Sequence, residues 1–326
     1  MKTLLTSAVV ALTATVATAR ENVQIAGSST VLPYATIVAE AFGENFDFAT
    51  PVVESGGSSA GLKRFCEGLG ENTIDIANSS RPIKDSERKV CAENGVDDIT
   101  EVRIGYDGIV FAFSKKLKGF DALTTGEIYL ALSPNHNYTT WNEINPALPK
   151  ETILAFIPGT KHGTREVFEE KVMIEGCKQV GDYDKFLEEL GDKKAAASKC
   201  AEAATKENKA IDIDGDYTET LARIEGNKNA VGVFGLAFYY NNTDKLYTAT
   251  INGVEGTQAT VASGEYPVSR PLFFYVKDAH LGVIPGLAEF VNFFVADEIA
   301  GSDGPLAQYG LVSDPELAVT QDMLNK

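Results

Sequence analysis

The sequence predicts an α/β protein with about two domains, and three observations support this prediction. The chain has 326 residues, and at about 100–200 residues per domain this length allows two domains with separate cores. Its composition, 44% hydrophobic and 23% charged, is that of an ordinary globular protein. Near the N-terminus, three units of strand, polar loop and helix follow one another, which indicates a parallel sheet covered by helices.

Each of these three units begins with a short apolar run and continues into a loop of small polar residues. The runs predict strands at 23–26, 51–54 and 74–77. Apolar residues at helical spacing predict a helix over 32–44, and the second helix is expected to start at Leu62. The third helix is expected to follow Pro82 and to include Asp85, Glu87 and Arg88.

The remainder of the chain predicts a second domain. A long apolar run at 102–113 lacks a helical period and is expected to cross into that domain. A buried strand is expected at 153–157, with a helix at 166–174, and the Lys-, Glu- and Ala-rich segment 178–208 predicts a solvated helical insertion. The expected division is residues 20–110 plus 250–326 in one lobe and residues 111–249 in the other.

Residues 1–19 have the pattern of a cleaved export signal. Lys2 precedes an apolar stretch over residues 4–16, and the segment ends in Ala17-Thr18-Ala19, a small-x-small cleavage pattern. A membrane anchor is the alternative, but it needs about 20 apolar residues, and this run is shorter and interrupted by Thr and Ser. We therefore expect an exported, periplasmic protein.

The four cysteines follow the expected signal and favour disulfides, because disulfides form in oxidising compartments. Pairing of nearest neighbours would give Cys66–Cys91 and Cys177–Cys200, and two other pairings remain open. A zinc site is the alternative, but no two cysteines have the close spacing that such sites use.

The formal net charge of −17 argues against general nucleic-acid binding, which needs a basic surface. At first sight it also argues against an anionic ligand. Charges far from a site are screened over about 8–10 Å, however, so local donors can still bind an anion.

Small hydroxyl residues occur in four loops between a predicted strand and a predicted helix. The carboxyl ends of parallel strands are where α/β proteins bind ligands, and the N–H groups of helix starts suit a tetrahedral oxyanion. Helix capping would explain the hydroxyls of any one loop, but an anion site accounts better for all four. The candidates are Ser29, Thr30, Ser58, Ser80 and Thr164, with Arg81 and Arg165 as cations.

A secreted serine hydrolase or phosphatase is a competing hypothesis. Gly57-Ser58-Ser59-Ala60-Gly61 matches the G-x-S-x-G pattern of a nucleophile elbow, with Ser59 as the nucleophile. Such an enzyme needs a downstream acid and a histidine base. The chain has three histidines, His136, His162 and His280, and no local pattern marks any of them as a base.

Several of these segments resemble the periplasmic phosphate-binding proteins of ABC phosphate importers, the PstS family. The similarity extends in order over nearly the whole chain after residue 19. The segments that carry it are Ala26-Gly27-Ser28-Ser29-Thr30-Val31-Leu32-Pro33, Gly57-Ser58-Ser59-Ala60-Gly61, Asp75-Ile76-Ala77-Asn78-Ser79-Ser80-Arg81-Pro82-Ile83, Tyr106-Asp107-Gly108-Ile109, Thr140-Trp141-Asn142, Pro158-Gly159-Thr160 with Gly163-Thr164, and Ser269-Arg270-Pro271-Leu272.

The resemblance implies a two-lobed periplasmic-binding-protein fold of the type II kind. Each lobe would be a mixed, mostly parallel sheet flanked by helices, and the ligand would lie in the cleft between the lobes. By position, the implied ligand-binding residues are Ser29, Thr30, Val31, Ser58, Ser80 and Arg81 from one lobe and His162, Gly163, Thr164 and Arg165 from the other.

Three departures from the family pattern concern the site. His162 stands where many relatives have Ser, Pro158 stands where an arginine often precedes the loop, with Arg165 as a substitute, and Ser80 replaces an Asp found in many members. That Asp accepts the proton of monohydrogen phosphate and thereby rejects sulfate. In this chain Asp107 is the candidate for that role.

We therefore expect a monomeric binding protein without cofactor, metal or catalytic activity. It would bind inorganic phosphate in the periplasm and deliver it to the membrane permease subunits of an ABC importer. Another tetrahedral oxyanion, such as sulfate or molybdate, and the Ser59 hydrolase remain as alternatives.

Overall fold

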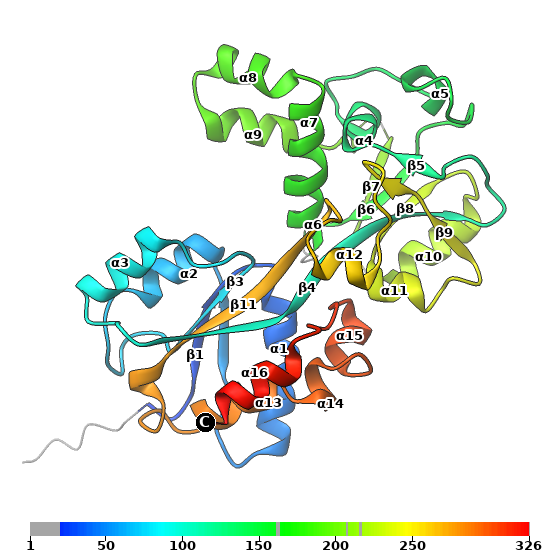
Figure 1. Ribbon diagram of the computed structural model, residues 1–326. Coiled ribbons are helices and arrows are strands. Elements are labelled where there is room, and N and C mark those ends of the chain that lie inside the picture. The colour runs from blue at the N-terminus through cyan, green and yellow to red at the C-terminus, as the bar shows by residue number, and fades with distance from the viewer. Residues whose placement is uncertain (1–19, 161–163, 207, 215–216, 326) are drawn as a thin grey trace, which may run out of the picture.

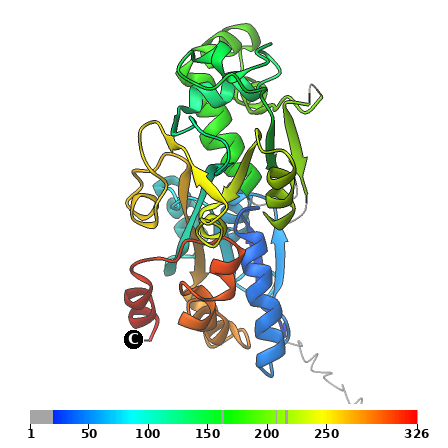
Figure 2. The ribbon, with the colours of Figure 1, turned by 90° about the vertical axis from the view of Figure 1, so that its right-hand side faces the viewer.

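The computed structural model describes residues 20–160, 164–206, 208–214 and 217–325, so the predicted signal at residues 1–19 lies outside the described residues. Figure 1 shows two lobes, one in blue, cyan, orange and red and the other in green and yellow. Figure 2, turned by 90°, shows the lobes stacked along one long axis. The two-lobed α/β architecture is the one predicted.

The first lobe is built on the predicted strand–loop–helix units. Strands β1, β2 and β3 pair in parallel in the order β2-β1-β3, as expected for successive crossovers. The elements of this lobe are β1 (Gln24–Gly27), α1 (Leu32–Asn45), β2 (Val52–Ser55), α2 (Ser58–Phe65), β3 (Ile76–Ser79), α3 (Asp85–Glu93), η2 (Asp278–His280), α13 (Leu287–Phe294), α14 (Asp297–Ala300), α15 (Pro305–Tyr309) and α16 (Leu317–Leu324).

Two long strands connect the lobes. β4 (Ile99–Ser114) pairs antiparallel with β11 (Ser269–Lys277) in the first lobe and then, from Ile109 onward, with β8 (Val231–Gly235) in the second. Figure 1 shows both strands running between the lobes. The predicted crossover at 102–113 is confirmed, and the change of partner beside Gly108 marks the junction.

The second lobe has a mixed sheet in the order β4-β8-β6-β7, with β9 also pairing with β4. The predicted insertion forms two helices, α8 and α9. The elements are β5 (Ala122–Leu123), α4 (Thr125–Leu132), α5 (Trp141–Ile144), β6 (Ala155–Pro158), α6 (Thr164–Val167), the π-helical η1 (Phe168–Ile174), α7 (Glu175–Gln179), α8 (Asp182–Leu190), α9 (Lys193–Ala201), β7 (Ala210–Ile213), α10 (Tyr217–Gly226), β8 (Val231–Gly235), α11 (Leu236–Tyr240), β9 (Leu246–Thr248), β10 (Thr250–Ile251) and α12 (Gln258–Ala262).

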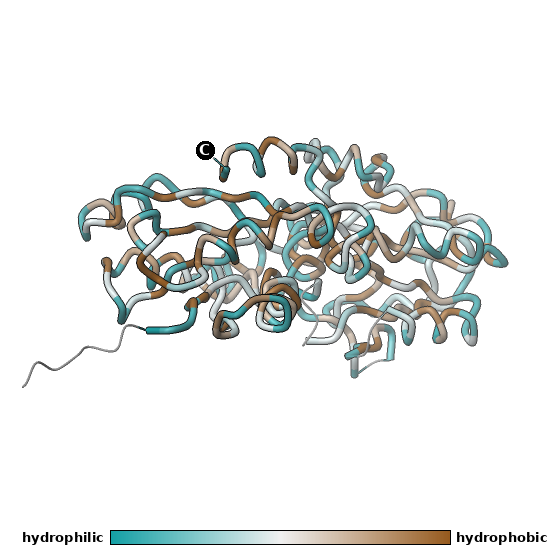
Figure 3. Tube along the Cα trace, turned by 90° about the horizontal axis from the view of Figure 1, so that it is seen from below, coloured by the Kyte–Doolittle hydropathy of each residue, from teal (hydrophilic) through white to brown (hydrophobic). Residues whose placement is uncertain are grey.

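Each lobe has its own hydrophobic core. Helices α1 and α13 cover one face of the first-lobe sheet, α2 and α3 cover the other, and a larger core fills the second lobe. In Figure 3 hydrophobic and hydrophilic residues alternate within helices and strands of both lobes, as expected for segments that bury one side. No helix within the described ranges is long and apolar enough to cross a membrane.

Two boundaries differ from the prediction. The chain returns to the first lobe near Ser269 rather than at residue 250, because Ile251, Val261 and Val268 pack in the second-lobe core. Helix α2 begins at Ser58, one turn before Leu62. Serine in a first turn is easily read as part of a loop, since its side chain bonds nearby backbone groups in either setting.

The disulfides are Cys66–Cys91 in the first lobe and Cys177–Cys200 in the second. The nearest-neighbour pairing is therefore confirmed over the two other pairings. Since all four cysteines are paired, the zinc alternative is wrong.

Candidate oxyanion-binding cleft

The three serine-rich loops of the first lobe meet at the carboxyl ends of β1, β2 and β3. Two glycines make this convergence possible. A Cβ on Gly27 would lie 2.1 Å from the backbone oxygen of Asn78, and Gly27 has a φ of +146°. A Cβ on Gly61 would lie 2.4 Å from Cα of Gly27, so only glycine lets α2 approach the end of β1 this closely.

The loop before α1 presents Thr30 toward the second lobe. Ser28 accepts hydrogen bonds from the backbone N–H groups of Thr30 (3.2 Å) and Val31 (3.4 Å), which shapes the turn at the helix start. Thr30 is buried, and its hydroxyl donates to the Oε2 of Glu166 at 2.7 Å. Ser29 lies at the surface, where its Oγ accepts a hydrogen bond from Ser55 at 3.1 Å.

The second and third loops are joined through two serines. Ser58, the first residue of α2, places its Oγ 3.1 Å from the Oγ of Ser80, and it also accepts the Ser80 N–H at 3.1 Å. The two hydroxyls therefore lie side by side at one end of the cleft. Two adjacent hydroxyls that can each donate or accept suit the oxygens of an anion.

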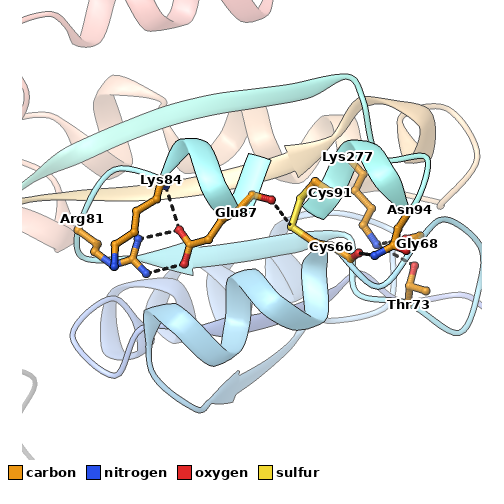
Figure 4. Close-up of a disulfide and its surroundings, with 9 residues drawn as sticks. All are labelled: Cys66, Gly68, Thr73, Arg81, Lys84, Glu87, Cys91, Asn94 and Lys277. Atoms are coloured by element: carbon orange, nitrogen blue, oxygen red, sulfur yellow. Dashed lines mark hydrogen bonds and ion pairs between the residues drawn. A yellow bond between two sulfur atoms is a disulfide. The ribbon is translucent and has the colours of Figure 1, made fainter. Parts of the chain in front are cut away.

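Arg81 is oriented by Glu87 of α3. Its guanidinium donates to both carboxylate oxygens of Glu87, at 2.9 and 2.8 Å, and to Ser59 at 3.0 Å. Hydrogen bonding to Arg81 lowers the pKa of Glu87, which keeps the pair charged. Figure 4 shows this pair beside the Cys66–Cys91 disulfide, which joins α2 to α3.

The second lobe contributes the helix that begins at Thr164. Thr164 is buried, and its hydroxyl accepts a hydrogen bond from Tyr217 at 3.2 Å. Glu166 and Glu170, one turn apart on the same side of this helix, both reach Arg270 of β11, at 3.1 and 3.0 Å. Burial is the main reason that the pKa of Glu170 is raised.

Asp107 and Arg270 face each other in the β4–β11 ladder, where the chain passes between the lobes. The Asp107 side chain is fully buried, and neither carboxylate oxygen has a hydrogen-bond partner among the residues that the structure describes. Burial raises its pKa from 3.8 to about 6, although the charge of Arg270 opposes the shift. The buried Nε of Arg270 also lacks a partner within these described ranges.

These elements enclose a cavity of about 370 Å³. One wall carries the serines and Arg81 of the first lobe, and the other carries Arg270 and the two glutamates. The lining residues are Gly56, Gly57, Ser58, Ser59, Ala60, Ser80, Arg81, Glu166, Glu170 and Arg270.

Among the predicted ligand-binding residues, the structure brings Ser58, Ser80 and Arg81 into this cavity and links Thr30 to it through Arg270. Arg165 lies elsewhere. It is bonded to Glu169, Asp212 and the carbonyl of Pro158, and it lines a separate second-lobe cavity of about 600 Å³. His162 and Gly163 lie outside the described residues.

Three residues of the site were missed by the sequence analysis, namely Arg270, Glu166 and Glu170. The Ser269-Arg270-Pro271-Leu272 segment contributed to the family resemblance, and that was the available signal for Arg270. Nothing in the sequence places the glutamates beside this arginine, because the contact depends on how the two lobes meet.

The described residues give no support to catalysis by Ser59. Its Oγ accepts a hydrogen bond from Arg81, while His136 contacts Asp182 and His280 contacts Asp75, each at 2.7 Å. Neither His136 nor His280 lines the cavity that contains Ser59, so neither is placed to act as its base. Within the same part of the chain no group of His, Cys, Asp and Glu is arranged to hold a metal ion.

Comparison with known proteins agrees with this geometry. A model of the PBP superfamily domain matches residues 12–298. The phosphate-binding protein PstS of Staphylococcus epidermidis is 30% identical over 277 residues, which cover 83% of this chain and 74% of that protein.

Two solved structures have a similar fold and are 25% identical in sequence. A possible phosphate binding protein from Planctomyces limnophilus superposes with a TM-score of 0.71, covering 93% of this chain and 97% of that one. A protein from Clostridium perfringens, described as a phosphate ABC transporter substrate-binding protein and solved with bound phosphate, superposes with a TM-score of 0.52. The match covers 90% of this chain and 99% of that one. The chain therefore belongs to the PBP superfamily and, within it, to the PstS family of phosphate-binding proteins.

Proposed function

We propose that this protein binds inorganic phosphate in the cleft between its lobes and delivers it to an ABC importer. The observation that supports this most directly is Asp107, a fully buried carboxyl group for whose two oxygens the described part of the chain provides no hydrogen-bond partner. A buried acceptor of this kind is costly unless a ligand supplies a donor. Monohydrogen phosphate carries a proton to donate, and fully ionised sulfate does not.

The remaining oxygens of phosphate would be bound by donors from both lobes and from the strands between them. Arg270, opposite Asp107 in the ladder, supplies charge-assisted hydrogen bonds, and its buried Nε, which has no partner in the described part of the chain, adds a donor. Thr30, Ser58 and Ser80 add hydroxyls, and the N-terminus of α1 adds backbone N–H groups. Arg81, held by Glu87, lines the same cavity. Val31, His162, Gly163 and Thr164 stay predicted ligands.

The remainder of the proposal follows the family. Relatives with this fold are named as phosphate-binding proteins, and one described as an ABC transporter substrate-binding protein was solved with phosphate. We infer a monomeric, exported protein that acts outside the cytoplasm, releases phosphate to membrane permease subunits and performs no chemistry. Two disulfides fit an oxidising compartment.

Isothermal titration calorimetry with phosphate, arsenate and sulfate tests the function. We expect phosphate and arsenate to bind well below the millimolar range and sulfate to bind much more weakly. Asp107→Asn should weaken phosphate binding at least a hundredfold and improve sulfate binding, because the amide can donate to an oxygen that carries no proton. Asp97→Asn, an exposed aspartate just before β4, is the matched control and should behave as wild type.

The competing functions predict different results. Saturable sulfate or molybdate binding with no phosphate binding would assign the cleft to another oxyanion. Release of phosphate from an ester substrate, abolished by Ser59→Ala, would instead make the protein a hydrolase.

A further inference from the structure

Glu166 contacts the donors that an oxyanion would use in this cleft. Its Oε2 accepts the hydroxyl of Thr30 at 2.7 Å and is 3.1 Å from the Nη2 of Arg270. Arg270 Nη2 also donates to the Oγ1 of Thr30, so each of the three side chains is hydrogen-bonded to the other two. Thr30 belongs to the first lobe, Glu166 to the second and Arg270 to the strand between them.

The charges around Arg270 leave little room for an additional anion. Among the described residues, Glu166 and Glu170 contact it, and Asp107 faces it in the ladder. One cation therefore faces three carboxyl groups. Adding a phosphate without moving a carboxylate would place like charges together in a partly buried site, which is unfavourable.

The two partners of the ion pair differ in their freedom to move. The Arg270 side chain is 5% exposed, whereas that of Glu166 is 36% exposed. Glu166 also lies in the first turn of a helix and lines the cavity. It can turn its carboxylate into water at small cost, while Arg270 must stay and needs another anion.

We propose that Glu166 is an internal stand-in for the ligand: its carboxylate joins the lobes across Thr30 and Arg270 in the empty protein, and phosphate must displace it to bind. This rests on the proposed function, because it assumes that Thr30 and Arg270, which Glu166 would leave, are groups that bind phosphate. Glu166 would then lower the affinity for phosphate and hold the lobes together before phosphate arrives.

Two substitutions separate displacement by contact from long-range charge repulsion. Glu166→Gln removes the charge and keeps the shape, and should lower the phosphate Kd about tenfold. Glu166→Asp keeps the charge but shortens the side chain by one methylene, so it should lose the contact and also bind more tightly than wild type. Glu169→Gln is the matched control: it lies on the same helix but pairs with Arg165 outside the cleft, and its Kd should be unchanged.

A measurement without phosphate makes the inference independent of the ligand's identity. In small-angle X-ray scattering of phosphate-free protein, Glu166→Gln should increase the radius of gyration relative to wild type and Glu169→Gln. An unchanged radius would overturn the interlobe contact, and an unchanged or weaker phosphate affinity in Glu166→Gln would overturn the displacement. If wild type bound no phosphate, the proposed function would fail, while the scattering result would still decide the contact.

Discussion

The two lobes contribute to the cleft in different ways. The first lobe supplies hydroxyls from three loops whose positions are set by packing, by the Arg81–Glu87 pair and by a disulfide between α2 and α3. The second lobe supplies a single helix, and two of its glutamates contact the arginine of the connecting strand.

This difference indicates that the two lobes have different roles in phosphate binding. A set of donors held in place by secondary structure loses little conformational freedom when a ligand arrives. Acidic side chains on an opposing lobe can instead exchange partners as the lobes move. We therefore expect substitutions in the first lobe to change how well phosphate is held, and substitutions at the second-lobe glutamates to change what must be displaced.

Arg270→Met should have the largest effect, because it removes the cation on which both lobes depend. Phosphate affinity should fall at least a hundredfold, and loss of the positive charge opposite the buried Asp107 should destabilise the fold, because Glu166 and Glu170 can turn into water but Asp107 cannot. Calorimetry and urea unfolding measure the two quantities. Arg88→Met, which removes an exposed pair with Glu101, should change the stability by less than about 1 kcal/mol and leave the affinity unchanged.

Removing each disulfide compares the two lobes directly. The closed loops are similar, with sequence separations of 25 and 23 residues, so each Cys-to-Ser pair should destabilise the protein by about 3–4 kcal/mol. Only Cys66→Ser with Cys91→Ser should also weaken phosphate binding, because α2 carries Ser58 and α3 carries Glu87. Equal losses of affinity in both double variants would contradict this comparison.

Asp107 should make the phosphate-free protein less stable as the pH rises. Its pKa in the folded protein, about 6, lies above the value of 3.8 expected when exposed, so the folded state holds the proton more tightly. That stabilisation is complete below about pH 4 and is lost as the pH rises through 6.

Asp107→Asn should therefore be as stable as wild type near pH 4 and more stable by about 2–3 kcal/mol at pH 7.5. Urea unfolding of the phosphate-free proteins across this pH range measures the difference. A difference that does not change with pH would show that Asp107 does not titrate in this range.

Ser58→Ala should have the smallest effect. The substitution removes one hydroxyl of the first-lobe wall and the acceptor of the Ser80 N–H. We expect the free energy of phosphate binding to weaken by about 1–1.5 kcal/mol, which is about tenfold in affinity. Ser86→Ala, an exposed serine in the first turn of the neighbouring helix α3, should bind as wild type. The comparison needs only calorimetry, and equal affinities in the two variants would remove Ser58 from the site.

The fold could be predicted largely from local patterns. Apolar runs followed by serine-rich loops marked β1, β2 and β3, and the apolar run around Phe111 marked the crossing between lobes, because strand periodicity and loop composition are properties of short segments. The return near Ser269 was predicted too early, since pairing of β10 with β5 in the second lobe depends on residues far apart in the chain.

In the candidate site, too, the residues near strand ends could be predicted from local sequence, and the residues brought in by long-range contacts could not. Ser58, Ser80 and Arg81 could be placed near one another from the sequence because each lies within three residues of the end of its strand, and parallel strands end at one edge of a sheet. Arg165 was placed in the site because it adjoins the right loop, but its guanidinium pairs with Asp212 on another side of the lobe. Arg270, facing Asp107 and reaching Glu166, depends on strand register and on the approach of two lobes. These are long-range relations that only the folded chain establishes.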